Sequence, residues 1–272
     1  MNFLTYLETK GFSNKTRASI YSDVIKFINW CEDENIESEQ STYTEILAYI
    51  KHIQKRNIKQ RTIQIYIGSL KHYFTWLVKR ELIAENPIKQ IKIQGIQRKY
   101  LYHIIKKQEL ETLYESFKIP TTKTHRQLAA KRNKVILGLM IWQGLGTREL
   151  ANLEEKDLKL REGKIYIQGS RKSNERELKL EAHQVLDIME YQLKTRQEIL
   201  NFRKDNNQSD SLFVSTGSSD HFNNIIQKLI QKLKQQNPAV ESIKQIRTSV
   251  ITHWLKSYNL REVQYKAGHR YV

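Results

Sequence analysis

Cysteine, proline and glycine are scarce in this sequence. Its 272 residues include 1 Cys, 3 Pro and 10 Gly. The single cysteine, Cys31, excludes a disulfide framework and a cysteine-based zinc ribbon. So few turn-forming residues favour long helices over a sandwich of many short strands. We therefore expect a mainly helical protein and exclude an all-β one.

Long hydrophobic runs are also absent. No stretch approaches the ~18 consecutive apolar residues of a membrane span, and the first residues, MNFLTYLETKGF, lack the basic and apolar segments of a secretory signal. The histidines show no HExxH or comparable ligand spacing. We expect a soluble cytoplasmic protein without a membrane partner, a metal site or a cofactor.

Positive charge is abundant. The chain carries 46 Lys and Arg against 29 Asp and Glu, a net charge of +17. Residues 1–98 hold 15 basic and 10 acidic residues, and the other residues hold 31 and 19, so both halves are basic. This charge suits a polyanionic partner. At about 150 residues a domain, the length predicts two domains.

Helical periodicity dominates the first half of the chain. Apolar residues recur at helical spacing in residues 13–30, 46–53 and 61–80, with Ser13 or Asn14 as the first helix start. The Asn86-Pro87 pair closes this region. We predict a helical domain over residues 1–90, followed by a basic linker over residues 91–100.

The second half, residues 101–272, mixes helices with one predicted β-hairpin. Two alternating segments, residues 164–167 and 177–180, flank the polar turn 169–174. A helix is expected to end at Gly144, and Thr147 is expected to cap a short helix through Leu153. Further helices are predicted at residues 107–117, 133–143, 182–202, 220–236, 245–257 and 260–266.

Four short motifs in this half could carry chemistry, although each has an ordinary structural explanation. A glycine turn presents Arg148 at a helix start, where it could hold a phosphate or simply pair with a local Glu. The hairpin turn carries Arg171 and Lys172, with Arg176 just beyond it. These cations either face solvent or reach into a groove, where a mobile Lys could protonate a leaving oxygen.

The other two motifs lie near the C-terminus. Lys244 and Arg247 are three residues apart on one predicted helix, which favours an anion between them. An ordinary basic helix start would give the same pattern. His269 follows a glycine, and a lone His is more often structural than catalytic.

The order of these motifs resembles the tyrosine recombinase (phage integrase) family, in its XerC/XerD-like or mobile-element integrase and transposase branches. The likeness extends over nearly the whole chain. It implies a mainly α fold with a small β-sheet: an N-terminal helical core-binding (SAM-like) domain over residues 1–90, and an α+β catalytic domain over residues 101–272. Together these domains would form a C-shaped clamp on DNA.

The resemblance also implies roles for individual residues. GLGTREL resembles the box of the first catalytic arginine, here Arg148. The hairpin resembles the turn that carries the mobile catalytic lysine, with Lys172 as the best match and Arg171 and Arg176 as the alternatives. KQIRTSVITHWL makes Arg247 the second arginine and places Lys244 where the family usually has histidine. His269 takes the third conserved position. The implied reaction is phosphoryl transfer through a 3′-phosphotyrosyl intermediate, with neither metal nor cofactor.

One departure concerns the nucleophile. The family's tyrosine lies about nine residues beyond the histidine, whereas Tyr271 is two residues beyond His269. We expect that the nucleophile and the C-terminal docking segment are missing, so that this chain binds DNA but does not cleave it. The expected partners are double-stranded DNA with an inverted-repeat core site and further copies, as a dimer or tetramer, near the bacterial nucleoid. The expected DNA-binding residues are Lys59, Arg61, Lys71, Arg98, Lys99, Arg171 and Arg176.

Two other functions fit the composition. A DNA-binding regulator on the same scaffold would need the basic surface without the catalytic residues. A helical RNA-binding protein is the second, but the sequence lacks the repeated exposed aromatics that stack single-stranded bases.

Overall fold

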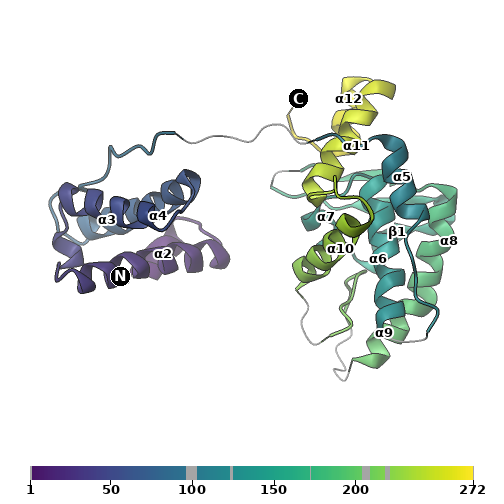
Figure 1. The fold of residues 1–272 in the computed structure, drawn as a ribbon, viewed down its shortest axis with the longest axis horizontal. Coiled ribbons are helices and arrows are strands. Elements are labelled where there is room, and N and C mark those ends of the chain that lie inside the picture. Colours follow the sequence, from purple (N-terminus) through teal and green to yellow (C-terminus); the bar gives the residue numbers. More distant parts are fainter. Residues whose placement is uncertain are drawn as a thin grey trace. The chain divides into compact units, whose positions relative to one another are not determined.

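The computed structural model describes residues 2–95, 103–122, 125–171, 173–203, 209–217 and 221–271. The chain divides into two compact units, residues 1–100 and 101–272 (Figure 1), and each unit is treated by itself. The fold is mainly helical with one small sheet, which confirms the predicted fold class. Among the described helices, none is long and apolar enough to span a membrane.

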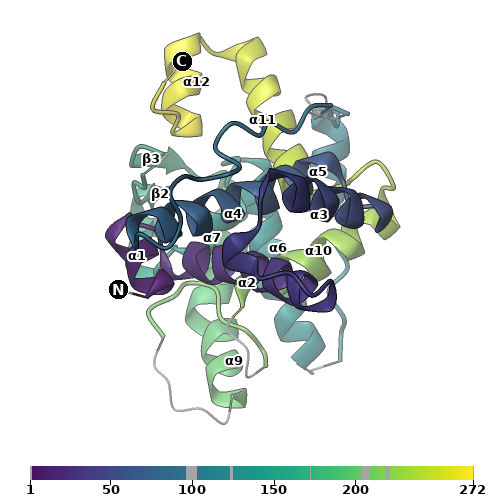
Figure 2. The same cartoon turned by 90° about the vertical axis from the view of Figure 1, so that its left-hand side faces the viewer.

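The first unit is helical. Its helices are α1 (Phe3–Thr9), α2 (Asn14–Asp33), the short 3-10 helix η1 (Ser38–Gln40), α3 (Tyr43–Lys55) and α4 (Gln60–Lys79). Helix α1 packs beside α2 and α4 (Figure 2), and α2 and α4 pack extensively on each other. The sequence did not predict α1, because seven residues are too few to show a helical period.

Helix ends in this unit follow local chemistry. Ser13 starts α2 as predicted, and its Oγ accepts the Thr16 backbone N–H at 3.4 Å. Helix α4 ends at Lys79, before Asn86-Pro87, because Glu81 adopts a left-handed conformation with φ 58°. The core is aromatic at its centre, where the rings of Phe27 and Tyr49 meet edge to face at 5.1 Å.

The chain that leaves α4 is fastened to the first unit. Lys71 Nζ donates to the carbonyl oxygens of Lys89 (3.1 Å) and Ile91 (2.7 Å). Ile91 and Ile93 also pack against the core. The expected linker, residues 91–100, therefore begins attached to the unit, and its last five residues lie outside the described part of the chain.

The second unit surrounds a three-stranded antiparallel sheet, ordered β1-β2-β3, with helices. Its strands are β1 (Leu158–Lys159), β2 (Lys164–Ile167) and β3 (Arg176–Lys179). Its helices are α5 (Lys107–Glu115), α6 (His125–Ile141), α7 (Thr147–Ala151), α8 (Ala182–Glu190), α9 (Arg196–Phe202), α10 (Phe222–Gln236), α11 (Ile243–Ser257) and α12 (Leu260–Ala267). Short helical turns also occur at η2 (Glu155–Asp157), η3 (Leu160–Glu162) and the π-helical η4 (Tyr191–Thr195).

The predicted hairpin is confirmed, with Ile165 opposite Leu178. The predicted helix over residues 182–202 is also present, as α8 and α9 joined by η4. Strand β1 was not predicted, since two residues carry no alternation. Helix α6 begins eight residues earlier than predicted, at His125 rather than at residue 133.

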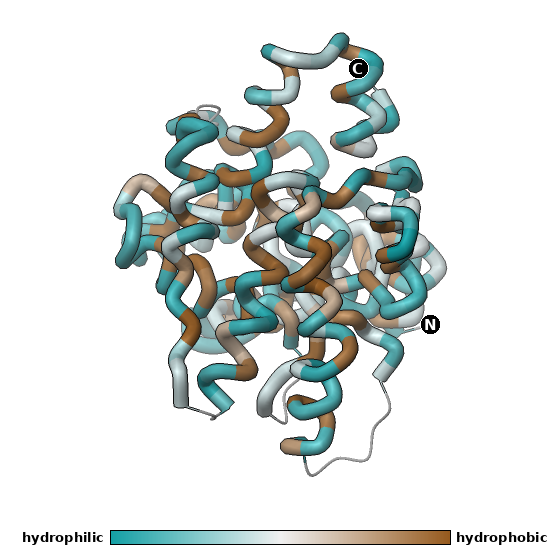
Figure 3. Tube along the Cα trace, turned by 90° about the vertical axis from the view of Figure 1, so that its right-hand side faces the viewer, coloured by the Kyte–Doolittle hydropathy of each residue, from teal (hydrophilic) through white to brown (hydrophobic). Residues whose placement is uncertain are grey.

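Helix α6 forms the centre of this unit. Its residues from Val135 to Ile141 are all buried, so this second half of the helix is apolar on every side. It contacts α5, α8, α9 and α11. Figure 3 shows the corresponding hydrophobic segments inside the unit, with hydrophilic segments around them. This core holds the ends of α7, β3, α11 and α12, which form the site described below.

Candidate active site

A glycine turn after α6 builds the first wall of the site. Gly144 has φ 59°, and a Cβ at this position would lie 3.0 Å from Cη2 of Trp254. Both constraints favour glycine. The chain then turns into α7, whose N-cap residue is Gly146. The predicted Thr147 cap is wrong: Glu149 Oε2 accepts the Gly146 N–H at 2.9 Å instead.

Glu149 is the centre of a buried ion network. Its Oε1 accepts a hydrogen bond from Arg176 Nη2 on β3 at 2.8 Å, and its Oε2 pairs with Arg247 Nη1 on α11. Burial favours the neutral acid, but the two guanidinium groups and the Gly146 N–H outweigh it and lower the pKa of Glu149. The carboxylate is therefore ionised at neutral pH.

The Arg247 guanidinium is held by three hydrogen-bond acceptors. Its Nη1 donates to Gly144 O at 2.7 Å and to Glu149, and its Nη2 donates to Ala267 O at 2.6 Å. Those bonds occupy three of the five N–H groups of a guanidinium. The side chain keeps 18% of its exposure. Among its contacts with described residues, Nε–H and one Nη2–H remain for a ligand on the open side.

The end of α12 closes against the hairpin turn. Gly268 has φ 70°, and a Cβ here would lie 2.4 Å from Arg176 Nη1, so only glycine fits without displacement. Asn174 N donates to Gly268 O at 3.0 Å, and Arg270 Nη2 donates to Ser170 O at 2.9 Å. The hairpin turn and residues 268–270 therefore form one wall.

His269 lies on this wall at the surface. A backbone bridge pairs it with Ser173. Partial burial of the ring, together with the charges of Arg247 and Arg176, lowers the pKa of His269, and Glu149 opposes this shift. His269 is therefore neutral at pH 7, and its ring lies within electrostatic reach of Arg247.

Two more expected residues lie on the exposed side. Lys244 is exposed in the first turn of α11, one turn before Arg247. Arg148 is exposed beside Glu149 and lines a small hollow of about 20 Å³ with Asn152 and Ser170. No hydrogen bond joins Arg148 to the ion network among the described residues.

Comparison with known proteins identifies the family to which this arrangement belongs. Residues 103–272 match the Phage integrase family, and residues 1–84 match the N-terminal SAM-like domain of phage integrases. The chain belongs to the phage integrase family. The family predicted from the sequence is thus confirmed.

Curated relatives of this integrase-family chain include two staphylococcal tyrosine recombinases XerC. The protein of Staphylococcus haemolyticus is 28% identical over 160 residues, 58% of this chain and 51% of the relative. The protein of Staphylococcus epidermidis is 26% identical over 149 residues, 55% and 48% of the two chains. The chain thus matches only about half the length of these relatives.

Solved structures share the fold. A lambda integrase dimer bound to a COC′ core site aligns with a TM-score of 0.66 at 16% identity, covering 98% of this chain and 72% of that chain. The Tn1549 transposon integrase in complex with circular intermediate DNA aligns with a TM-score of 0.61 at 14% identity, covering 100% and 93%. At these identities the likeness concerns the fold alone.

The expected catalytic residues of this integrase-family chain are brought together only in part. Arg247 and His269 share one site, and Lys244 precedes Arg247 on the same helix. Arg148 is adjacent in sequence to Glu149, but its side chain faces solvent. Lys172 lies outside the described residues.

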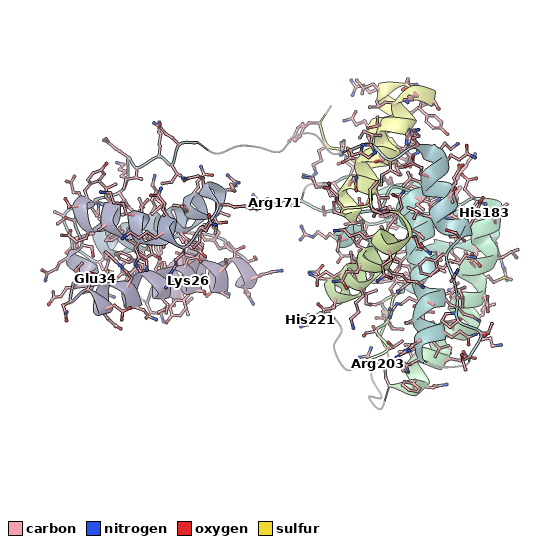
Figure 4. All side chains as sticks on the ribbon, in the orientation of Figure 1. Lys26, Glu34, Arg171, His183, Arg203 and His221 are labelled. Atoms are coloured by element: carbon pink, nitrogen blue, oxygen red, sulfur yellow. The ribbon has the colours of Figure 1, made fainter. Side chains whose placement is uncertain are left out.

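One expected DNA-binding residue, Arg176, needs correction, and a second, Lys71, is engaged within its own unit. Arg176 is 2% exposed and its charge is paired with Glu149, so it is enclosed and cannot reach a phosphate. Lys71 donates to two main-chain carbonyls of its own unit. Lys59 and Arg61 are exposed at the start of α4, and Arg171 projects from the hairpin tip (Figure 4). Arg98 and Lys99 lie outside the described residues.

The sequence analysis missed Glu149 and Ser173. Glu149 could have been found from its spacing, because a Glu three residues after a helix N-cap commonly accepts the cap N–H. Nothing in the sequence links it to Arg176 or Arg247. In the described part of the chain, no three His, Cys, Asp or Glu side chains gather to hold a metal ion.

Proposed function

We propose that this chain is the core-binding and catalytic part of a site-specific DNA recombinase, an integrase or transposase that breaks and rejoins duplex DNA. The observation that carries the proposal is the fixation of Arg247. Its guanidinium is held by two carbonyls and one carboxylate, it stays 18% exposed, and His269 lies beside it. Such a preorganised cation suits a phosphate whose charge grows during transfer.

The proposed reaction combines this geometry with the roles that the family resemblance implies. Arg247 would bind non-bridging oxygens of the scissile phosphate through its remaining N–H groups, and Arg148 and Lys244 would add positive charge from the exposed side. His269, neutral at pH 7, would accept or share a proton at the attacking oxygen. Lys172 would protonate the leaving 5′ oxygen. The attacking tyrosine would join the 3′ phosphate and keep the bond energy for rejoining.

We propose that Tyr271 is not the nucleophile of the reaction. Tyr271 is 86% exposed and two residues from His269, closer than the family's spacing implies. Residues 1–272 alone would therefore bind DNA without forming a covalent adduct. Incubation with a nicked duplex and denaturing electrophoresis tests this, because a DNA-linked band that disappears in Tyr271→Phe would contradict it.

The proposed partner is duplex DNA with an inverted-repeat core site. Lys59, Arg61 and Arg171 are the exposed candidates for phosphate contacts. Solved structures of similar fold include a lambda integrase dimer on a core site and a lambda integrase tetramer on a Holliday junction. By this likeness we propose that copies of this chain assemble on DNA as a dimer or tetramer.

Selection from a random duplex pool tests the proposal. The bound fraction is sequenced at moderate and raised salt, and an enriched inverted repeat supports a core site. Arg247→Ala is expected to weaken binding to that duplex about tenfold, as the loss of one phosphate contact predicts. Lys194→Ala, an exposed cation on η4, is the matched control and should change little. No enrichment, with affinity lost at raised salt, would contradict site-specific function.

A DNA-binding regulator is the second candidate, and the position of Arg148 favours it. This side chain makes no hydrogen bond with the described residues of the Glu149 network, as expected if it has no catalytic duty. In a chain extended to carry the family's nucleophilic tyrosine, Arg148→Ala separates the two functions: the regulator keeps its biological output, whereas a recombinase binds the core site but loses recombination.

A further inference from the structure

We propose that Arg176 is a positioning residue whose charge neutralises Glu149, so that Glu149 orients Arg247 without cancelling the charge that Arg247 presents to DNA. The inference rests on the proposed function, because it assigns Arg247 to a DNA phosphate. Arg176 itself would touch neither DNA nor the reacting atoms.

The first support is the burial of Arg176. Its side chain is 0% exposed, although it starts at the edge of a hairpin whose tip faces solvent. Its Nε donates to Lys266 O at 2.8 Å, and its Nη2 donates to Glu149 at 2.8 Å. A fully desolvated guanidinium is costly unless it is paired, so its charge is committed to Glu149.

The second support is the charge balance of the network. Two arginines share one carboxylate, which leaves one positive charge uncompensated. Arg176 is completely enclosed, whereas Arg247 keeps 18% exposure. The uncompensated charge therefore faces outward at Arg247. If Arg176 were absent, Glu149 would pair with Arg247 alone, and the network would present no net charge to an anion.

The third support concerns the neighbouring groups. His269 is neutral at pH 7 because its pKa is lowered, so it adds no charge at this wall. Lys244 and Arg148 are exposed, whereas Arg176 is completely enclosed and Glu149 is largely enclosed. The charge at Arg247 is therefore set by the two buried partners, Glu149 and Arg176.

A purely structural role makes different predictions. Arg176 also bonds the hairpin turn, through Ser173 Oγ at 3.4 Å and Asn174 O at 3.5 Å. If these bonds were its whole function, Arg176→Met would harm the site whatever the charge of residue 149. The two roles are separated by restoring the charge balance without restoring the bonds.

The experiment is a charge cycle in the full chain. Arg176→Met gives the network a net charge of zero, Glu149→Gln gives +2, and the double variant returns it to +1. Affinity for the selected duplex is measured between 50 and 200 mM salt. The salt slope of Arg176→Met should fall by about 1, the effect of one lost phosphate charge. The double variant should recover the wild-type slope.

Two results would overturn the proposal. A double variant that stays as weak as Arg176→Met shows a structural role or a direct DNA contact. If the salt dependence of DNA affinity is unchanged in Arg176→Met, Glu149 does not cancel the charge of Arg247. Arg161→Met, an exposed arginine on η3, is the matched control, and thermal melts of all variants establish that they are folded.

A second readout needs no DNA. His269 is followed by NMR titration of the full chain, with His269→Gln used for assignment. Arg176→Met should raise the pKa of His269, Glu149→Gln should lower it, and the double variant should fall between them, because these charges act on the ring. The wild-type chain could bind no specific DNA site while the pKa of His269 still changes among the variants in this order. The proposed function would then be wrong, but the proposed neutralisation of Glu149 by Arg176 would be supported. If the pKa of His269 is the same in all variants, the proposed charge balance among Glu149, Arg176 and Arg247 is wrong.

Discussion

The two units bury different kinds of polar side chain. Among the described residues, the first unit buries Asp23, Ser41 and Ser69, short groups that lie between its helices. The second unit buries short groups too, among them Asp157, Thr195 and Ser249, and in addition three arginines, Arg132, Arg176 and Arg196. The first unit is thus held mainly by apolar and aromatic packing, whereas the second also relies on long cationic side chains.

The difference follows from what the arginines contact. Arg132 donates to Val214 O at 2.8 Å, and Arg196 donates to Ser211 O at 2.9 Å. These carbonyls lie outside the named strands, although Ser211 forms an isolated antiparallel bridge with Glu154. A guanidinium presents five N–H groups in a fixed fork, so one side chain can satisfy several of them. Burial lowers the pKa of Arg132 to about 10, which leaves it charged at pH 7.

The largest loss in the free energy of unfolding of the second unit is expected for Arg196→Met. Arg196 pairs with Glu155 at 2.6 Å and holds the Ser211 carbonyl from a fully buried position. Its loss leaves a carbonyl and a carboxylate without their partner and should cost the second unit about 3 kcal/mol. Urea unfolding, followed by a probe in each unit, measures this loss.

The control for this prediction is Arg161→Met, an exposed arginine in the same unit, which should change stability by less than about 0.5 kcal/mol. The first unit has its own core and should unfold at its original midpoint. An equal loss in both units would show that the two cores are not independent.

An intermediate loss in the free energy of unfolding is expected for Gly268→Ala. The left-handed backbone alone costs an alanine about 1 kcal/mol, and the added Cβ would also displace the Arg176 guanidinium. We expect a loss of about 2 kcal/mol, near the middle of the range for strained backbone positions. Gly163→Ala is the matched control, because Gly163 has φ 62° and open space around its Cα. Equal losses in thermal unfolding would show that the contact with Arg176 carries no energy.

The smallest effect is the pH dependence of His269. Because its pKa is lowered below 6.5 in the folded chain, the unfolded chain binds this proton more readily. The folded state therefore loses stability as pH falls from the unfolded pKa through the folded one. NMR titration should give a midpoint below 6.5. A midpoint above that value would place a net negative charge near the ring.

The sequence predicted the elements better than the connections between them. The helices of residues 13–30, 61–80 and 182–202 and the hairpin are periodic over many residues, and each is present. Helix α1 and strand β1 are too short to show a period. The first half of helix α6 is polar and largely unburied and shows no apolar stripe, whereas residues 135–141 are buried on every side, so only the second half was predicted.

The site was predicted in its residue types but not in its network. Arg247 and His269 were found from motif order, and both lie in the site. Arg176 was assigned to DNA because it follows a basic turn. Its burial depends on Gly268, 92 positions away, where the missing Cβ admits the guanidinium. Local sequence patterns carry no information about such a distant contact.

The hydrogen bonds from Arg247 to two main-chain carbonyls also have a consequence for the order of folding. Its partners Gly144 and Ala267 are separated by most of the second unit, so the carbonyl clamp closes a loop of more than 120 residues. Contacts between residues so distant in sequence form late, after local helices. During synthesis, which proceeds from the N-terminus, the first unit can be folded while Arg247 still lacks its last acceptor. A chain still on the ribosome would therefore have a folded first unit before the proposed phosphate site is assembled.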